Sequence, residues 1–188
     1  MAENKTLLLL ARSKRAAFRT REFAASYKNK AYARLVLHRL KKQGKIKSVK
    51  KGWWAFPDAM PEAVACEISR PAYLSFHSAL YLHRLTTQFP RWIQLAVSRP
   101  ARKYALEGTE AKEYRIRPGS FRDFSVKDGM LLATPEKAFS DCLNVPRACP
   151  QIVLAEALPG IDTEQVKKQI TRPAARRLKE LMQRAEQG

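Results

Sequence analysis

Side chains that could bind a nucleic acid recur between residues 19 and 56. Arg34 could donate two hydrogen bonds to O6 and N7 of a guanine, and Lys30, Tyr32 and His38 could contact base edges or adjacent phosphates. Lysines further along the segment could neutralise phosphates without reading sequence. The complete set of candidate DNA-binding residues is Arg19, Arg21, Lys28, Lys30, Tyr32, Arg34, His38, Lys42, Lys45, Lys47, Lys50 and Lys51.

The positive charge of the chain is concentrated around these residues. Residues 1–56 contain 16 Lys and Arg against Glu3 and Glu22, whereas residues 57–188 contain 20 Lys and Arg against 15 acidic residues. The net charge of +19 is therefore mostly local. A local excess in a helix-rich segment is typical of a protein that binds a polyanion, and nucleic acid is the leading partner.

Two predicted helices would position the basic side chains. Thr20 is expected to cap a first helix that ends near Tyr27, and Asn29 to cap a second helix over residues 30–43. Gly44 follows, and glycine suits the left-handed conformation that ends a helix. The sequence therefore predicts two helices separated by a tight turn.

The second helix has an apolar side and a basic side. Apolar residues recur at the i, i+3, i+4, i+7 spacing of a buried stripe, at Ala33, Val36, Leu37 and Leu40. The opposite side carries basic residues and no acidic residue, although exposed helix faces usually mix both signs. An ordinary solvated face is the alternative interpretation, and Tyr32 and His38 could equally pack at its edge.

A lysine-rich hairpin is predicted after the second helix. Residues 45–49 alternate charged or polar side chains with apolar ones, residues 50–52 can turn the chain, and residues 53–56 return. We expect Trp53 and Trp54 to anchor this hairpin on the helices, with stacking on unpaired bases as the alternative.

Residues 1–57 are thus predicted to form a winged helix-turn-helix domain. A helix over residues 3–16 would pack behind the other two, and residues 18–19 could form the short strand that pairs with the hairpin. In this architecture the N-terminal part of the second helix enters the major groove of duplex DNA. Arg34 is therefore the best candidate for reading a base.

Residues 62–188 are predicted to form a small mixed α/β domain, so that the fold class of the whole chain is α+β. Pro57 and Pro61 mark the linker between the two domains. Two helices are expected over residues 60–69 and 76–85, and two more are expected to begin after Thr134 and Asp162. A basic amphipathic segment follows over residues 176–184. The expected strands cover residues 91–98, 112–117 and 130–133.

The sequence contains no recognisable catalytic or metal-binding pattern. His77 and His83 would lie about 240° apart on a helix, so they would not converge on a metal ion. Glycine-rich phosphate loops and catalytic serine motifs are absent from the sequence. We therefore expect no enzyme activity, no metal and no cofactor, although His77, Ser78 and Asp141 could in principle meet in space.

Cysteine usage and hydropathy predict a cytoplasmic protein with no membrane partner. Cys66, Cys142 and Cys149 are odd in number and lack CxxC spacing, which favours reduced structural thiols. The apolar run over residues 6–11 is too short to span a bilayer or to serve as a secretory signal.

Two segments resemble the AbiEi family of antitoxins. The first reads YLSFHSALYLHRLTTQFP from Tyr73 to Pro90 and precedes an apolar strand, and the second reads ATPEKAFSDCL from Ala133 to Leu143. The family shares a SALxLHGLT…P segment, a following strand and an (S/T)PE(R/K)AxxD helix start, behind an N-terminal winged helix. Here Arg84 stands where the family often has glycine, and Trp54 stands where its wing commonly ends in tyrosine. The matching segments occur in the same order as in the family, and together they cover most of residues 18–145.

The resemblance implies a repressor and antitoxin of a type IV toxin-antitoxin system. Such proteins bind inverted repeats in their own promoter and counteract a nucleotidyltransferase toxin, generally without a stable complex. The charge and helix patterns support the DNA-binding half alone. Two alternatives remain: a winged-helix regulator whose C-terminal domain senses a ligand or dimerises, and an enzyme or RNA-binding factor.

Overall fold

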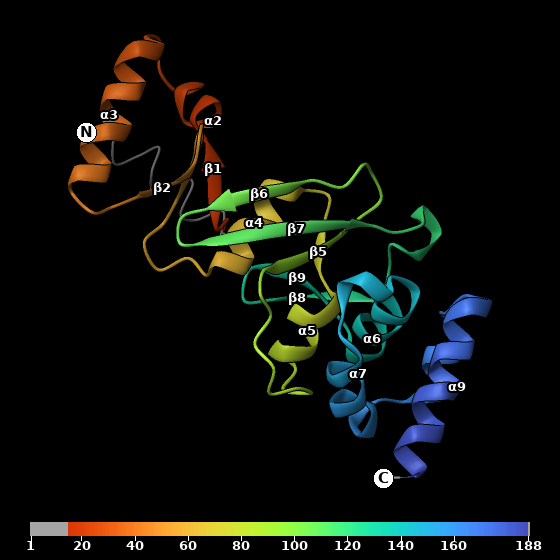
Figure 1. The fold of residues 1–188 in the computed structure, drawn as a ribbon. Coiled ribbons are helices and arrows are strands. Elements are labelled where there is room, and N and C mark those ends of the chain that lie inside the picture. Colours follow the sequence, from red (N-terminus) through yellow and green to blue (C-terminus); the bar gives the residue numbers. More distant parts are fainter. Residues whose placement is uncertain (1–14, 188) are drawn as a thin grey trace.

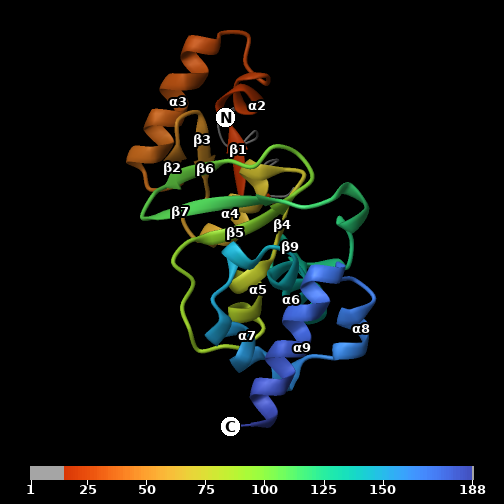
Figure 2. The ribbon, with the colours of Figure 1, turned by 45° about the vertical axis from the view of Figure 1, so that its right-hand side comes forward.

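The fold is α+β, as expected, and the residues that the structure describes form two β-sheets (Figures 1 and 2). The structure is a computed structural model that describes residues 15–187. The helix predicted over residues 3–16 therefore lies almost entirely outside the described residues. One sheet has three strands in the order β1-β3-β2, and the other has six in the order β6-β7-β5-β4-β9-β8.

From residue 15 onward, the N-terminal segment contains a short strand and two helices followed by a hairpin. Its elements are β1 (Ala17–Arg19), α2 (Thr20–Ala24), α3 (Lys30–Lys42), β2 (Lys47–Lys50) and β3 (Trp53–Ala55). The cap predicted for the second helix is confirmed, because Asn29 Oδ1 accepts hydrogen bonds from the backbone nitrogens of Ala31 (2.9 Å) and Tyr32 (3.1 Å). Gly44 follows α3 with a φ of 69°, which glycine adopts without strain.

The prediction for Thr20 was wrong. Arg19 is the N-cap of α2, Thr20 is its first residue, and the helix ends at Ala24 instead of near Tyr27. The Thr20 hydroxyl instead accepts a hydrogen bond from Trp54 Nε1 (2.8 Å) and donates one to the Gly52 carbonyl oxygen (3.3 Å). Thr20 therefore joins the helix to the hairpin.

The three-stranded sheet packs on both of its faces. Phe18 and Trp54 are paired across β1 and β3 and belong to a small core with the buried stripe of α3. Ala17 and Ala55 are the adjacent pair, and together with Val49 they belong to the larger core of the C-terminal segment. Side chains alternate between the faces of a strand, so this sheet is shared by both halves of the chain.

The six-stranded sheet forms the centre of the C-terminal segment. In Figures 1 and 2, α4 lies on one side of it, toward the N-terminal segment, and α5 and α6 lie on the other. The elements are α4 (Pro61–Ser69), β4 (Tyr73–Leu74), α5 (Phe76–Leu82), β5 (Ile93–Val97), β6 (Lys103–Leu106), β7 (Thr109–Arg115), β8 (Phe124–Lys127), β9 (Met130–Ala133), α6 (Pro135–Asn144), α7 (Gln151–Ala157), α8 (Thr163–Lys167) and α9 (Arg172–Glu186), with short 3₁₀ turns η1 (Pro118–Ser120), η2 (Pro146–Ala148) and η3 (Leu158–Gly160).

Several local predictions for the C-terminal segment are confirmed. Thr134 caps α6 through its side chain, and Asp162 caps α8 in the same way. The prediction for residues 99–117 was incomplete, because β6 and β7 form a hairpin around Gly108 and β7 begins at Thr109 instead of residue 112. Strand β8 was also missed; it has only four residues, and three of them are exposed.

Cys66, Cys142 and Cys149 are buried free thiols. Within residues 15–187, no helix has both the length and the apolar character needed to cross a membrane.

Candidate nucleic-acid interface

Basic side chains gather where α3 faces the start of α2 and the turn of the hairpin. We call Arg21, Lys30, Arg34, His38 and Lys51 the α3 surface; all five are exposed. Two shallow hollows lie on it, one of about 330 Å³ that includes Arg34 and His38, and one of about 460 Å³ that includes Arg21, Lys30 and Arg34. Arg34 therefore lies where the two hollows adjoin.

Hydrogen bonds hold the hairpin turn against the start of α2. The backbone nitrogen of Thr20 donates to the Gly52 carbonyl oxygen at 2.9 Å, in addition to the two bonds of the Thr20 hydroxyl. Gly52 has a φ of 78°, which favours glycine. The turn that carries Lys51 is therefore held in a fixed position relative to the start of α2.

Little acidic charge balances this surface. Residues 15–56 contain 13 Lys and Arg and one acidic residue, Glu22. The Glu22 carboxylate is already engaged, because it lies 3.3 Å from Arg15 Nη2 and accepts a hydrogen bond from the Arg19 backbone nitrogen at 3.0 Å. The positive potential at α3 is consequently available to an external polyanion.

The structure brings most of the predicted DNA-binding residues to the exposed surface of the N-terminal segment. Tyr32 is 45 % exposed, but its ring lies 6.1 Å from that of Tyr27; the His38 ring lies edge-on to Trp54 at 6.1 Å. Part of each of these two side chains therefore packs against a neighbouring aromatic ring, as the alternative interpretation allowed. The exposed members of the predicted set are Arg21, Lys28, Lys30, Tyr32, Arg34, His38, Lys42, Lys45 and Lys51.

Lys47 and Lys50 are placed differently from the prediction. Lys47 Nζ donates a hydrogen bond to the Pro57 carbonyl oxygen at 3.0 Å, and Lys50 Nζ lies 4.0 Å from the centre of the Tyr104 ring. The cause is a bulge between Ser48 and Lys50, which turns Lys50 to the face of the hairpin that packs on the C-terminal segment. Burial lowers the pKa of Lys50, with the nearby Arg102 contributing. We therefore remove both lysines from the phosphate-binding set.

The aromatic residues of the hairpin face inward. Trp54 is 8 % exposed and belongs to the small core, which confirms its predicted anchoring role. Trp53 is half-buried, and the Arg19 guanidinium lies 4.7 Å from its ring centre, so Arg19 is also held against the protein. Neither tryptophan therefore presents the fully exposed aromatic face that stacking on unpaired bases requires.

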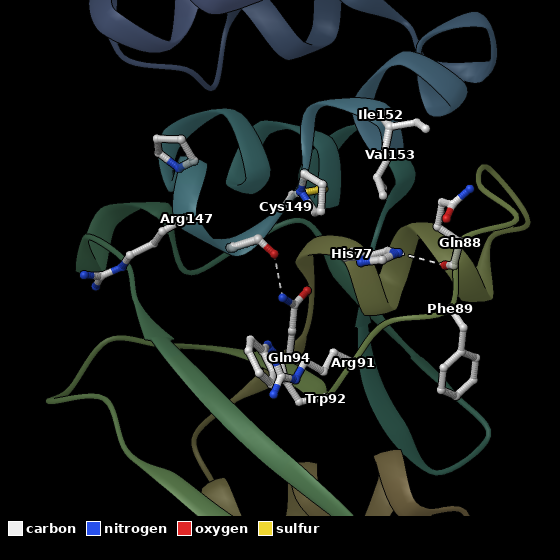
Figure 3. A pocket seen from close by; sticks show the side chains of 13 residues that line it. His77, Gln88, Phe89, Arg91, Trp92, Gln94, Arg147, Cys149, Ile152 and Val153 are labelled. Atoms are coloured by element: carbon white, nitrogen blue, oxygen red, sulfur yellow. Dashed lines mark hydrogen bonds between the residues drawn. The ribbon is translucent and has the colours of Figure 1, made fainter.

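His77, Ser78 and Asp141 belong to three separate hydrogen-bond groups. In Figure 3 the His77 ring points to Gln88, and its Nε2 lies 2.8 Å from the Gln88 carbonyl oxygen, beside a cavity of about 460 Å³. Ser78 Oγ donates to the Trp92 carbonyl oxygen at 3.2 Å. Asp141 is buried and bonded to other partners, of which Lys137 Nζ is 2.5 Å away. In the described part of the chain, no hydrogen bond joins the three residues.

Sequence reasoning missed a second group of basic residues, in the C-terminal segment. Six Lys and Arg side chains line one cavity near the start of α9: Arg115, Arg117, Arg122, Lys168, Arg172 and Arg177. They come from two stretches of the chain, residues 115–122 and 168–177, so no local spacing predicts that they meet. The pair Arg115 and Arg117 was the available signal, since alternate residues of a strand lie on the same face.

Comparison with known proteins adds a similarity in fold. No family model and no curated protein matches the chain. A solved structure of the protein RV2827C from Mycobacterium tuberculosis is similar, with a TM-score of 0.58 and 15% sequence identity, over 97% of this chain and 76% of that one. At this identity the similarity concerns the fold, which the two proteins share over nearly the whole of the present chain.

Proposed function

We propose that this protein is a DNA-binding transcriptional repressor with an N-terminal winged helix-turn-helix. The observation that carries the proposal is the α3 surface: an exposed, basic helix held beside a basic hairpin turn, with one engaged carboxylate nearby. A helix with its side chains is about 10–12 Å wide and fits a major groove about 12 Å wide. With α3 in the groove, Arg34 would face base edges and Lys51 would face the phosphate backbone.

The antitoxin half of the proposal rests on the resemblance of residues 73–97 and 133–143 to the AbiEi family. On that basis the protein would act in the cytoplasm, repress its own operon through inverted repeats, and counteract a nucleotidyltransferase toxin without a stable complex. If a nucleotidyltransferase gene neighbours that of this protein, co-expression of the two proteins should restore the growth that the nucleotidyltransferase alone arrests. Continued growth arrest, with operator binding intact, would favour a winged-helix regulator without an antitoxin role.

Arg34→Ala should weaken binding to the operator by about 1–3 kcal/mol, because one bidentate contact to a base has about this value. The measurement is fluorescence anisotropy with a duplex from the protein's own upstream region and with a shuffled duplex. Binding to the shuffled duplex should change much less. The control is Arg176→Ala, an exposed arginine of α9. An equal loss on both duplexes would remove Arg34 from the base-reading set.

Lys51→Ala should weaken binding to all duplexes alike. Loss of one phosphate contact should also reduce the slope of log affinity against log salt concentration by about 0.9. Lys50→Ala is the matched control, since Lys50 is adjacent in sequence but lies against Tyr104. A slope that changes for Lys50→Ala and not for Lys51→Ala would contradict this orientation of the hairpin.

A further inference from the structure

The second basic group surrounds a cavity of about 660 Å³. We call it the basic cavity. Its walls come from the end of β7 and the loop through η1, from α6, and from the stretch that joins α8 to α9. In both ribbon views these elements lie well away from α3 (Figures 1 and 2). A ligand of the basic cavity would therefore not touch the α3 surface.

The positive charge around the basic cavity is largely uncompensated. Asp141 is its one acidic lining residue, and its charge is already balanced by Lys137 Nζ at 2.5 Å. Arg122 lies 3.5 Å from Asp123. Among residues 15–187, no carboxylate pairs with the remaining exposed cations of the rim, which are Arg115, Arg117, Lys168 and Arg172. Such a concentration of one sign focuses positive potential into the hollow and attracts anions.

One wall of the basic cavity is fixed by Asn144 of α6. Asn144 Oδ1 accepts hydrogen bonds from the backbone nitrogen (3.0 Å) and hydroxyl (3.1 Å) of Thr171, and its Nδ2 donates to the Gln169 carbonyl oxygen (3.3 Å). Arg177 also donates to the Leu143 carbonyl oxygen. The backbone positions of Lys168 and Arg172 are thus set before any ligand arrives, which lowers the entropic cost of binding.

The lining is not uniformly charged. Ile116, Val145, Ile170 and Pro173 supply apolar surface, and the Gln169 side-chain Oε1 is buried without a hydrogen-bond partner. Binding pockets for small ligands typically measure about 300–1,000 Å³ and combine apolar walls with a few polar groups. Arginine guanidinium groups match phosphate oxygens in pairs. A ligand with several phosphates and one apolar, hydrogen-bonding part fits this lining.

We propose that the basic cavity binds a nucleoside triphosphate, with its phosphates on the arginines and its base toward the apolar wall and Gln169. The proposal does not depend on the proposed function, because it concerns other residues. It assigns a small-molecule ligand to the C-terminal segment of a chain whose N-terminal segment carries the DNA-binding surface.

The test is isothermal titration calorimetry of the full chain with ATP, GTP, adenosine and inorganic tripolyphosphate. We expect saturable binding of at least one nucleotide, and at least about tenfold weaker binding of adenosine and of tripolyphosphate, because each lacks one half of the contacts. Absence of saturable nucleotide binding would overturn the proposal. Tripolyphosphate that binds as tightly as the nucleotide would overturn the assignment of the base.

Substitutions test whether the nucleotide binds in the basic cavity. The double variant Arg117→Ala, Arg172→Ala should bind the nucleotide at least about tenfold more weakly, since two charge-assisted contacts are lost. Both side chains are exposed, so the melting temperature should stay close to that of the parent protein. Lys179→Ala removes an exposed charge of α9 outside the cavity and should leave binding unchanged. Arg34→Ala should also leave it unchanged; loss of nucleotide binding in Arg34→Ala with retention in the double variant would overturn the proposal.

Discussion

Asp141→Ala is expected to lower the free energy of unfolding by about 3–5 kcal/mol, since removing one partner leaves a buried charge uncompensated. The carboxylate lies 2.5 Å from Lys137 Nζ, and the two side chains are 2% and 3% exposed. Tyr73 OH and Ser75 Oγ also donate to Asp141, at 2.9 and 2.8 Å. The substitution therefore leaves one ammonium group and two hydroxyls without their acceptor.

Urea denaturation followed by circular dichroism measures this loss. The matched control is Glu164→Ala, which breaks another 2.5 Å pair, with Lys167, on the exposed surface. An exposed pair contributes only about 0–1 kcal/mol. The double variant Lys137→Met, Asp141→Leu removes both charges and should recover part of the lost stability. If Asp141→Ala costs no more than Glu164→Ala, the buried pair does not stabilise the fold as described.

Glu113→Gln should also lower the free energy of unfolding at neutral pH by about 3–5 kcal/mol, through the loss of a buried ionic network. The Glu113 side chain is fully buried, and Arg99 donates to both of its oxygens, at 2.7 and 2.9 Å. Arg102 Nη2 and Ser69 Oγ donate further hydrogen bonds to Oε1, at 2.9 and 2.8 Å. Glutamine cannot compensate the two guanidinium charges.

The same substitution should change the response to acid. Burial alone would raise the pKa of Glu113, but hydrogen bonds from Arg99, Arg102 and Ser69 outweigh it and lower the pKa to about 2. A lowered folded-state pKa stabilises the protein above the unfolded pKa of about 4.3, and that stabilisation is lost as the pH falls toward 2. The parent protein should therefore lose more stability than Glu113→Gln over this range.

Free energies of unfolding at several pH values between neutral and about 2 measure this difference. Glu110→Gln is the control on the same strand, because Glu110 forms a partly exposed pair with Lys103 at 2.9 Å. That variant should follow the parent protein at every pH. An acid response of Glu113→Gln equal to that of the parent protein would contradict the assignment of this transition to Glu113.

Local signals in the sequence were sufficient to predict α3 and the start of α6. Asn29 caps α3, the stripe from Ala33 to Leu40 is buried, and Thr134 caps α6. Each signal lies within about one or two helical turns, so the residues that form it are neighbours in both the sequence and the fold.

Features that depend on distant partners could not be predicted. Thr20 was predicted to cap a helix from its position alone. Its actual hydrogen-bond partners, Gly52 and Trp54, are more than 30 residues away in the sequence. Lys50 was assigned to the DNA-binding residues because neither the bulge nor its contact with Tyr104 has a local signal. The six basic residues that line the basic cavity are also far apart in the sequence: Arg115 and Arg177 are 62 positions apart.

The shared three-stranded sheet limits how two copies of this protein could sit on one operator. Ala17 and Ala55 pack on the C-terminal core, and Arg15 Nη2 contacts Glu67 of α4 at 2.6 Å, so the connection through Pro57 is not a free hinge. If the C-terminal segments of two copies meet, the distance between their α3 helices is fixed. On the operator proposed for this protein, the number of base pairs between inverted repeats would then affect binding, because one extra pair rotates a half-site by about 35° around the duplex axis.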